Sequence, residues 1–395
     1  MSKKVLCILF FLLVISGKGQ SKEATVCLNM IVKDEKDVIE KCLSSVKPFI
    51  DYWVIFDTGS TDGTQKIIKN FLKDIPGELH ESKWVNFQHN RNEALQAAKN
   101  KGDYLLFIDA DEVWKYSKGF KLPELTLDCY QVVVRHIDGG ADFKRVGLIN
   151  NHIDWKWHGV LHEDILSSQM KTKGTLDGII NICNESIGAR SKDPKKYLKD
   201  AKVLEEAFAN EPNNSRYAFY IAQAYLNADE LDTALKKFEK RLSMPSEDEQ
   251  ETYLALYQVG MIYTKLNRFD EAIDSFSKAY NFRPTRAEPL FRMAICYRKK
   301  GNFLLGYLLS KFALSFPYPK EDVCVETDTY SYAALIEYAN CALLLGRFPE
   351  GLQACKQLLD YPNLPANIRA SVISNYELAS KNVYGSVNHD AKAIR

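Results

Sequence analysis

The sequence predicts an α/β domain built on a mostly parallel sheet, followed by an all-α array of helical hairpins. Three observations support this fold class. Short apolar runs alternate with amphipathic helical patterns in the first half, and three of these runs end in a polar cluster. In the second half, small residues recur at two positions with one shared spacing. The length of 395 residues is enough for two or three domains, each with its own core.

The composition is that of an ordinary globular protein. Hydrophobic residues make up 46% of the chain and charged residues 26%, and the net charge is +1. No overall basic field indicates a nucleic-acid partner, and no acidic excess predicts disorder. The nine cysteines form no CxxC pair and no zinc-like spacing.

Residues 1–20 are expected to be a secretory signal peptide or a short membrane anchor. A short basic start at residues 1–4 precedes an apolar run at residues 5–15, and small residues follow at Gly17 and Gly19. A helix of that run would reach only about 17 Å, too short for a hydrocarbon core of about 30 Å. We therefore expect a secretory or luminal location, with a membrane-anchored form as the alternative and no later membrane span.

The first half alternates between strands and helices. The predicted strands are 25–32, 52–56, 79–84 and 104–108, and the helical patterns between them are 38–46, 67–72 and 91–99. Apolar runs without alternation are typical of strands covered on both faces, as in parallel sheets. Such sheets bind ligands at the carboxyl ends of their strands. Polar clusters at 33–35, 57–60 and 109–111 therefore predict a binding site at that edge.

Asp109 and Asp111 form the first candidate site. They flank one small residue after a buried strand, and residues two apart in a strand point the same way. Two hard carboxylates on one side suit Mn²⁺ or Mg²⁺ that also holds phosphate oxygens. The alternative is a pair of surface acids at a turn.

Three further residues at this edge are candidates for nucleotide contacts. Asp57 ends a buried strand, so its carboxylate could accept hydrogen bonds from a base or ribose, or it could cap a helix. Glu35, at the end of the first strand, could likewise contact a nucleotide or lie in a solvated turn. Arg91 is expected to begin a helix, where it could meet a phosphate or remain a surface arginine.

Four segments together resemble the family 2 glycosyltransferases, which have the GT-A fold, a nucleotide-diphospho-sugar transferase-like sheet. These segments are 29–35, 57–64, 91–94 and 102–112, in the family's order. The resemblance covers roughly residues 24–190. It implies an inverting hexosyl- or N-acetylhexosaminyl-transferase that uses a divalent metal and a nucleotide-sugar, commonly a UDP-sugar. By resemblance, the nucleotide-sugar would contact Glu35, Asp57, Arg91 and Asp109, and the metal would be bound by Asp109 and Asp111.

The catalytic base is expected within residues 155–164. This segment resembles the Gly-x-x-His-Glu segment in the branch of the family that carries tetratricopeptide (TPR) repeats. An inverting displacement needs a base to take the proton of the acceptor hydroxyl. Glu163 is the first candidate, and Asp164 and His162 are alternatives. His162 could instead be a third metal ligand.

Two tryptophans of the same segment, Trp155 and Trp157, could stack on sugar faces or pack in the core. The chain lacks the Gln-x-x-Arg-Trp motif of the processive synthases, which disfavours a cellulose-like or chitin-like polymerase.

The second half is predicted to be a TPR-like repeat array. One series of small residues is Ala222, Gly260, Ala294 and Ala339, and the other is Ala234, Ala272, Gly306 and Gly351. Both series step by 38, 34 and 45 residues, near the TPR period of about 34. The longer steps imply insertions near 244–250 and 318–328. Stacked hairpins form a groove that could hold a protein or glycan acceptor; otherwise the array would only stabilise the catalytic domain or mediate dimer contacts.

The predicted domains are 1–20 for the leader, 22–190 for the transferase, 191–385 for the TPR-like repeats and 386–395 for a C-terminal tail. The expected function is sugar transfer to a hydroxyl of a protein or glycan. The alternative is a catalytically inactive transferase-like protein that acts as a TPR binding scaffold. A nucleotidyltransferase is disfavoured because it would carry a Gly-rich loop after its first strand, and residues 32–37 contain no glycine.

Overall fold

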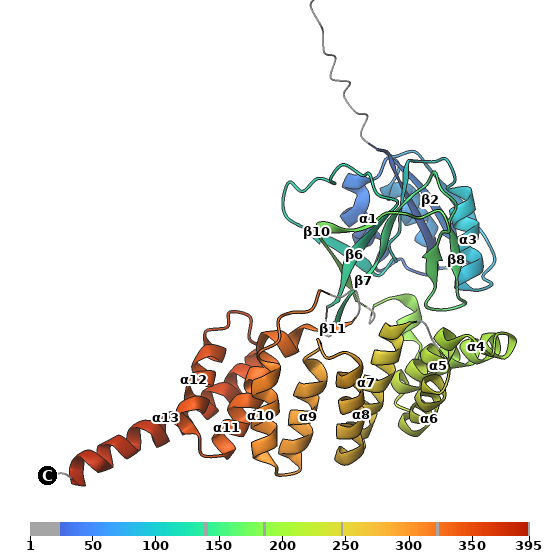
Figure 1. The fold of residues 1–395 in the computed structure, drawn as a ribbon. Coiled ribbons are helices and arrows are strands. Elements are labelled where there is room, and N and C mark those ends of the chain that lie inside the picture. The colour runs from blue at the N-terminus through green and yellow to red at the C-terminus, as the bar shows by residue number, and fades with distance from the viewer. Residues whose placement is uncertain (1–23, 138–140, 185–186, 246–247, 321–323, 394–395) are drawn as a thin grey trace, which may run out of the picture.

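The computed structural model describes residues 24–137, 141–184, 187–245, 248–320 and 324–393. A sheet domain lies against one side of a row of helices (Figure 1). The predicted leader, residues 1–20, lies outside the described residues. Within the described ranges, no helix has the length and apolar character needed to cross a membrane.

The sheet domain has the predicted α/β character, with a parallel half and a mixed half. The strand order is β3-β2-β1-β4-β7-β6-β10-β5, and β1, β2, β3 and β4 run parallel. Antiparallel pairing begins where β7 meets β4 and β6, and β10 again lies parallel to β6. A short hairpin, β8–β9, stands apart from this sheet. The strands are β1 (Val26–Val32), β2 (Tyr52–Asp57), β3 (Gly77–Glu81), β4 (Tyr104–Leu106), β5 (Glu112–Tyr116), β6 (Cys129–His136), β7 (Ala141–Asn150), β8 (Lys156–His158), β9 (Asp164–Leu166) and β10 (Lys173–Cys183).

Helices α1 (Ile39–Val46), α2 (Thr64–Phe71) and α3 (Phe87–Ala97) connect the parallel strands. The predicted start of α3 at Arg91 is four residues too late. The Asn86 side chain accepts a hydrogen bond of 2.8 Å from the His89 amide and so caps the helix there. Arg91 therefore lies in the second turn of α3, where its side chain can reach across the edge of the sheet.

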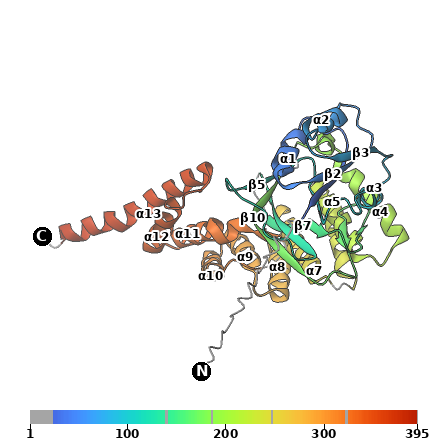
Figure 2. The same cartoon turned by 90° about the horizontal axis from the view of Figure 1, so that it is seen from above.

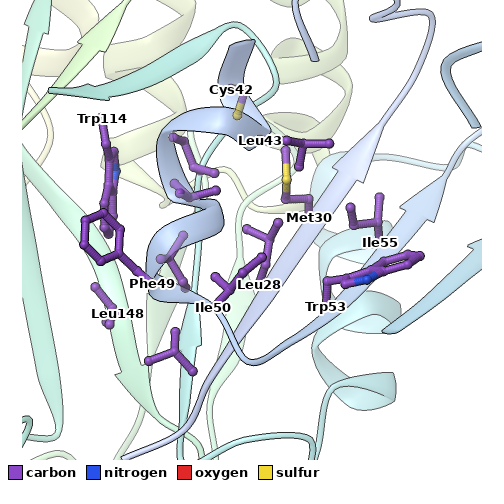
Figure 3. Close-up of a cluster of buried hydrophobic side chains, with 14 of the residues drawn as sticks. Leu28, Met30, Cys42, Leu43, Phe49, Ile50, Trp53, Ile55, Trp114 and Leu148 are labelled. Carbon is purple, nitrogen blue, oxygen red and sulfur yellow. The ribbon is translucent and has the colours of Figure 1, made fainter. Parts of the chain in front are cut away.

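The main core lies between α1 and the sheet. Leu43 and Cys42 of α1 are fully buried above Leu28 and Met30 of β1 (Figure 3). Trp114 of β5 extends this core and is 6.0 Å from the ring of Phe49. The core thus fixes the ends of β1 and β2 and the start of β5, which carry the polar clusters.

The second half consists of stacked helical hairpins, as predicted. The helices are α4 (Lys196–Asn210), α5 (Ser215–Asn227), α6 (Leu231–Leu242), α7 (Glu249–Lys265), α8 (Phe269–Phe282), α9 (Glu288–Lys299), α10 (Phe303–Ala313), α11 (Ala334–Leu344), α12 (Phe348–Leu359) and α13 (Ala366–Ala393). Residues 386–393 of the expected C-terminal tail continue α13, and residues 394–395 lie outside the described residues. Figure 2 shows α13 extending away from the rest of the row.

The recurring small residues lie where neighbouring helices touch. A Cβ atom added to Gly260 of α7 would come within 2.6 Å of the Phe276 ring on α8. One added to Gly306 of α10 would come within 2.8 Å of Cys341 Sγ on α11. The two spaced series therefore mark close helix contacts, which confirms the repeat prediction.

The two halves of the chain share an interface. Leu161, which precedes β9, packs with Leu204, Tyr217 and Ile221 of α4 and α5. The insertion predicted near 318–328 contributes β11 (Val325–Glu326), which pairs antiparallel with β7. A strand from the repeat half thus extends the sheet of the first domain (Figure 1).

Replacing Gly260 with valine is expected to destabilise the protein, because the new side chain would overlap the Phe276 ring in a packed seam. The expected loss is about 1–3 kcal/mol in the free energy of unfolding, measured by denaturant titration.

Lys236→Val, on the exposed face of α6, serves as the control for the helix propensity of valine. It should stay within about 0.7 kcal/mol of the unaltered protein. Equal losses in the two variants would contradict the close contact at Gly260.

Candidate active site

Two arginines gather carboxylates from several elements at the edge of the sheet. Arg91 of α3 donates through Nη2 to Asp109 Oδ1 at 2.7 Å and through Nε to Glu163 Oε1. Arg145 of β7 donates through Nη1 to Asp109 Oδ2 at 3.0 Å and through Nη2 to Glu112. Asp109 therefore has both oxygens engaged, and the predicted base Glu163 lies at the same arginine.

Asp109 and Asp111 lie in a turn and not in a strand. β4 ends at Leu106 and β5 begins at Glu112, whose amide donates to the Asp109 carbonyl at 3.1 Å. The same-side argument from strand geometry is therefore wrong for this pair. Burial disfavours the charge of Asp109, but the two guanidinium groups prevail and hold its pKa well below the usual range.

Asp111 has a different electrostatic environment from Asp109. Among the described residues its carboxylate makes no ion pair. Burial, reinforced by the charges of Asp109 and Glu112, raises the pKa of Asp111 to about 6. Its Oδ2 atom faces Gly188, where an added Cβ atom would approach to 2.5 Å. This carboxylate carries negative charge that no neighbouring cation holds directly.

Glu35 contacts the residue that follows Gly188. Its carboxylate accepts hydrogen bonds of 3.3 and 3.4 Å from the Ala189 amide. Burial is the main cause that raises the pKa of Glu35 to about 7, and the charge of Asp111 adds to it. Asp111 and Glu35 thus offer hard oxygen donors whose charge a divalent cation would stabilise, so this donor set fits Mn²⁺ or Mg²⁺.

Only one of the two carboxylate oxygens of Asp57 has hydrogen-bond partners among the described residues. Its Oδ1 atom accepts from the Gly59 and Ser60 amides at 2.9 and 2.8 Å, and from Gln65. Its Oδ2 atom is buried and has no partner among the described residues. Asp57 is not a helix cap, since α2 begins after Gly63. One buried acceptor therefore remains for a donor group of a ligand.

The segment that carries Glu163 turns its neighbours away from the metal candidates. The His162 ring stacks on Tyr220 of α5 with centroids 4.1 Å apart. Asp164 makes an ion pair of 2.9 Å with Arg216 of the same helix. Nowhere in the described ranges do three or more His, Cys, Asp or Glu side chains gather to hold a metal. The structure does not bring His162 together with Asp109 and Asp111.

The His162 ring also has an unusual charge environment. Lost hydration, together with the charges of Arg216, Arg190 and Lys196, lowers the pKa of His162 to about 4. The ring is therefore neutral at neutral pH, and its neighbours are cations of the linker and the helical half.

The two tryptophans of this segment have packing roles. Trp157 is 93% buried, meets Phe107 edge to face at 5.1 Å, and lies 5.0 Å beneath the Arg91 guanidinium. Trp155 donates through its ring nitrogen to the Asn150 carbonyl at 2.9 Å. Trp157 thus supports Arg91 from below.

Sequence reasoning missed Arg145, Glu112 and Arg216 as site residues. Glu112 directly follows the Asp-x-Asp pair, so its position in the motif was an available signal. Arg145 has no local motif and meets Asp109 across 36 residues of sequence. Only the pairing of β7 with β4 brings that arginine to the site.

Comparisons with known proteins agree with this division of the chain. Residues 27–158 match the model of glycosyl transferase family 2. The SPbeta prophage-derived glycosyltransferase SunS of Bacillus subtilis is 25% identical over 243 residues, which are 58% of this chain and 56% of SunS. The chain thus spans about half the length of SunS. A TPR repeat-containing protein of Synechococcus elongatus is 24% identical over 311 residues, 74% of this chain and 75% of that protein.

Solved structures of TPR proteins resemble part of the chain. YrrB, described as a TPR protein with an unusual peptide-binding site, covers 47% of this chain and is itself covered over 85%, with 17% identity and a TM-score of 0.37. A tetratricopeptide repeat protein from Parabacteroides merdae covers 51% and is covered over 72%, with 15% identity and a TM-score of 0.38. The chain therefore has an N-terminal domain that matches glycosyl transferase family 2 over residues 27–158, followed by a TPR-like helical region.

Proposed function

We propose that this protein is a metal-dependent, inverting glycosyltransferase that moves a sugar from a nucleotide-sugar, most simply a UDP-sugar, to a hydroxyl of a protein or glycan. The observation that carries the proposal is the double ion pair of Arg91 with Asp109 and Glu163. It joins the Asp-x-Asp turn to the expected base at the carboxyl edge of the parallel strands, where such sheets bind ligands.

On the donor side, Asp57 would accept a hydrogen bond from the nucleoside through its unpartnered Oδ2 atom. Asp111 and Glu35 would hold the divalent cation, since burial disfavours their charge and no arginine pairs with them. When bound, the cation would offset the negative charge that develops on the diphosphate leaving group. Arg91 and Arg145 keep Asp109 ionised and fix the turn that also carries Asp111.

On the acceptor side, Glu163 would act as the general base. Arg91 occupies its Oε1 atom and leaves the second oxygen to take the proton of the attacking hydroxyl. Attack on the anomeric carbon from the face opposite the nucleotide would then invert its configuration. Asp164 is the less favourable base because its carboxylate is paired with Arg216 of α5, whereas the arginine that binds Glu163 also binds Asp109 of the Asp-x-Asp turn.

The acceptor would meet the enzyme near the seam between the two halves and not along the whole repeat array. Tyr257 of α7 and Arg292 of α9 both bind the Glu326 carboxylate of β11, each at 2.8 Å. Arg216 and Tyr220 of α5 contact the Glu163 segment. Contacts with β11 and with the Glu163 segment thus occupy these residues of α5, α7 and α9. An acceptor extending from Glu163 would reach only the part of the array that makes no such contacts.

Removal of the metal ligand should abolish donor turnover. Asp111→Asn is expected to lower the kcat of UDP-sugar hydrolysis in Mn²⁺ on the order of 100-fold or more, and EDTA should do the same to the unaltered protein. The measurement is UDP release from a panel of UDP- and GDP-sugars. The matched control is Asp177→Asn, an exposed carboxylate of β10.

An unaltered protein that neither binds nor turns over any donor with Mn²⁺ or Mg²⁺ would contradict this proposal. That outcome would instead favour the inactive TPR binding scaffold. Turnover that persists in EDTA and in Asp111→Asn would retain the transferase and remove the metal from its mechanism.

Removal of the base should separate catalysis from binding. Glu163→Gln is expected to reduce kcat by about 10²–10⁴-fold while leaving the affinity for UDP and Mn²⁺ within about twofold, because Asp57, Asp111 and Glu35 are unchanged. The control is Glu124→Gln, at an exposed position. If Asp164→Asn lost turnover and Glu163→Gln kept it, the base would be Asp164.

A further inference from the structure

Arg216 of α5, in the helical half of the chain, binds the residues immediately before and after Glu163 in the sequence. Its Nη2 atom donates to the His162 carbonyl at 2.9 Å and lies 2.9 Å from Asp164 Oδ2. Its Nη1 atom donates to Glu251 of α7 at 3.0 Å. One guanidinium therefore links the residue before Glu163, the residue after it and the neighbouring helical hairpin.

The contacts around Arg216 restrict its own motion. The guanidinium lies 4.9 Å over the Tyr220 ring, and the same ring carries the stacked His162 on its surface. Glu251 is 94% buried and has Arg241 of α6 as a second cationic neighbour at 3.6 Å. Arg216 is thus held from two helices before it reaches the catalytic half.

The backbone it holds adopts a conformation that needs support. His162 has a φ of +52°, a left-handed conformation that is unfavourable for a non-glycine residue. Such conformations persist where the surrounding contacts determine them. Here the supporting contacts are the Arg216 hydrogen bond to the His162 carbonyl and the ring stack on Tyr220, both from α5.

This turn decides where Glu163 lies. With His162 and Asp164 both drawn toward α5, the side chain of Glu163 between them reaches Arg91 on the opposite side. Glu163 is itself mostly enclosed, with a side chain 9% exposed. Releasing the turn would leave the ion pair with Arg91 as the main restraint on the Glu163 carboxylate.

We propose that Arg216 is a positioning residue for the transfer reaction: it holds residues 162–164 so that the Glu163 carboxylate meets both Arg91 and the attacking hydroxyl. The inference rests on the proposed function, in which Glu163 is the base. It makes the first hairpin of the TPR-like region part of the catalytic unit, beyond any role in binding an acceptor.

The test compares Arg216→Met with the unaltered full chain, using hydrolysis of the UDP-sugar identified from the panel and calorimetric binding of UDP with Mn²⁺. A displacement of a catalytic group by about 1 Å can cost on the order of 100-fold in rate. We expect kcat to fall roughly 10- to 100-fold, while the donor KM and the UDP affinity stay within about twofold. Arg216→Lys should recover part of kcat, because one ammonium can replace some but not all of these bonds.

The matched control is Arg268→Met, which also removes an arginine over a tyrosine ring (Tyr263, 4.6 Å) and a carboxylate pair (Glu271, 2.9 Å), but at an exposed turn of the array. Its kcat should be unchanged. The inference is overturned if Arg216→Met keeps kcat within twofold, or if kcat, donor KM and UDP affinity all deteriorate together, as a general loss of structure would cause.

Tyr220→Leu keeps the proposal testable if Arg216→Met does not fold. It removes the ring beneath His162 and leaves every charge paired, so we expect kcat alone to fall about 10-fold. An unchanged kcat in that variant would overturn the inference. If the unaltered protein turns over no donor at all, the proposed function fails and this inference fails with it, which differs from an active protein that is indifferent to Arg216.

Discussion

The site depends on one guanidinium that binds two carboxylates far apart in sequence. Arg91 lies on α3, Asp109 follows β4, and Glu163 precedes β9, so their ion pairs join three separate segments. The arginine is largely enclosed and rests on the ring of Trp157. Removing either carboxylate would leave buried positive charge poorly compensated, which is why these segments must be placed together.

The carboxylates of the acidic cluster differ in their charged partners and therefore in their expected roles. Asp109 has two arginine partners and stays ionised, whereas burial raises the pKa values of Asp111 and Glu35. The first carboxylate is an internal structural anion. The other two make no ion pair with an arginine among the described residues, and this is the physical basis for proposing that they bind a divalent cation.

The helical half is joined to the catalytic half by polar and apolar contacts at both ends of the interface. At one end α4 and α5 pack on Leu161 and bind the residues that flank Glu163. At the other end β11 extends the sheet through β7, the strand that also carries Arg145. Repeat arrays are commonly regarded as separate binding modules. In this chain the array instead restrains two of the segments that build the site.

The sequence by itself determined the alternation of strands and helices, the repeat spacing, and the polar clusters after β1, β2 and β4, because burial on both faces and close helix packing leave local patterns. It could not place the start of α3, where an asparagine cap prevailed, nor the turn that separates Asp109 from its strand. Only the tertiary structure decided which charges meet. Arg145 and Arg216 reach the site through β7 pairing and the interdomain seam, and such contacts across tens of residues leave no periodicity in the chain.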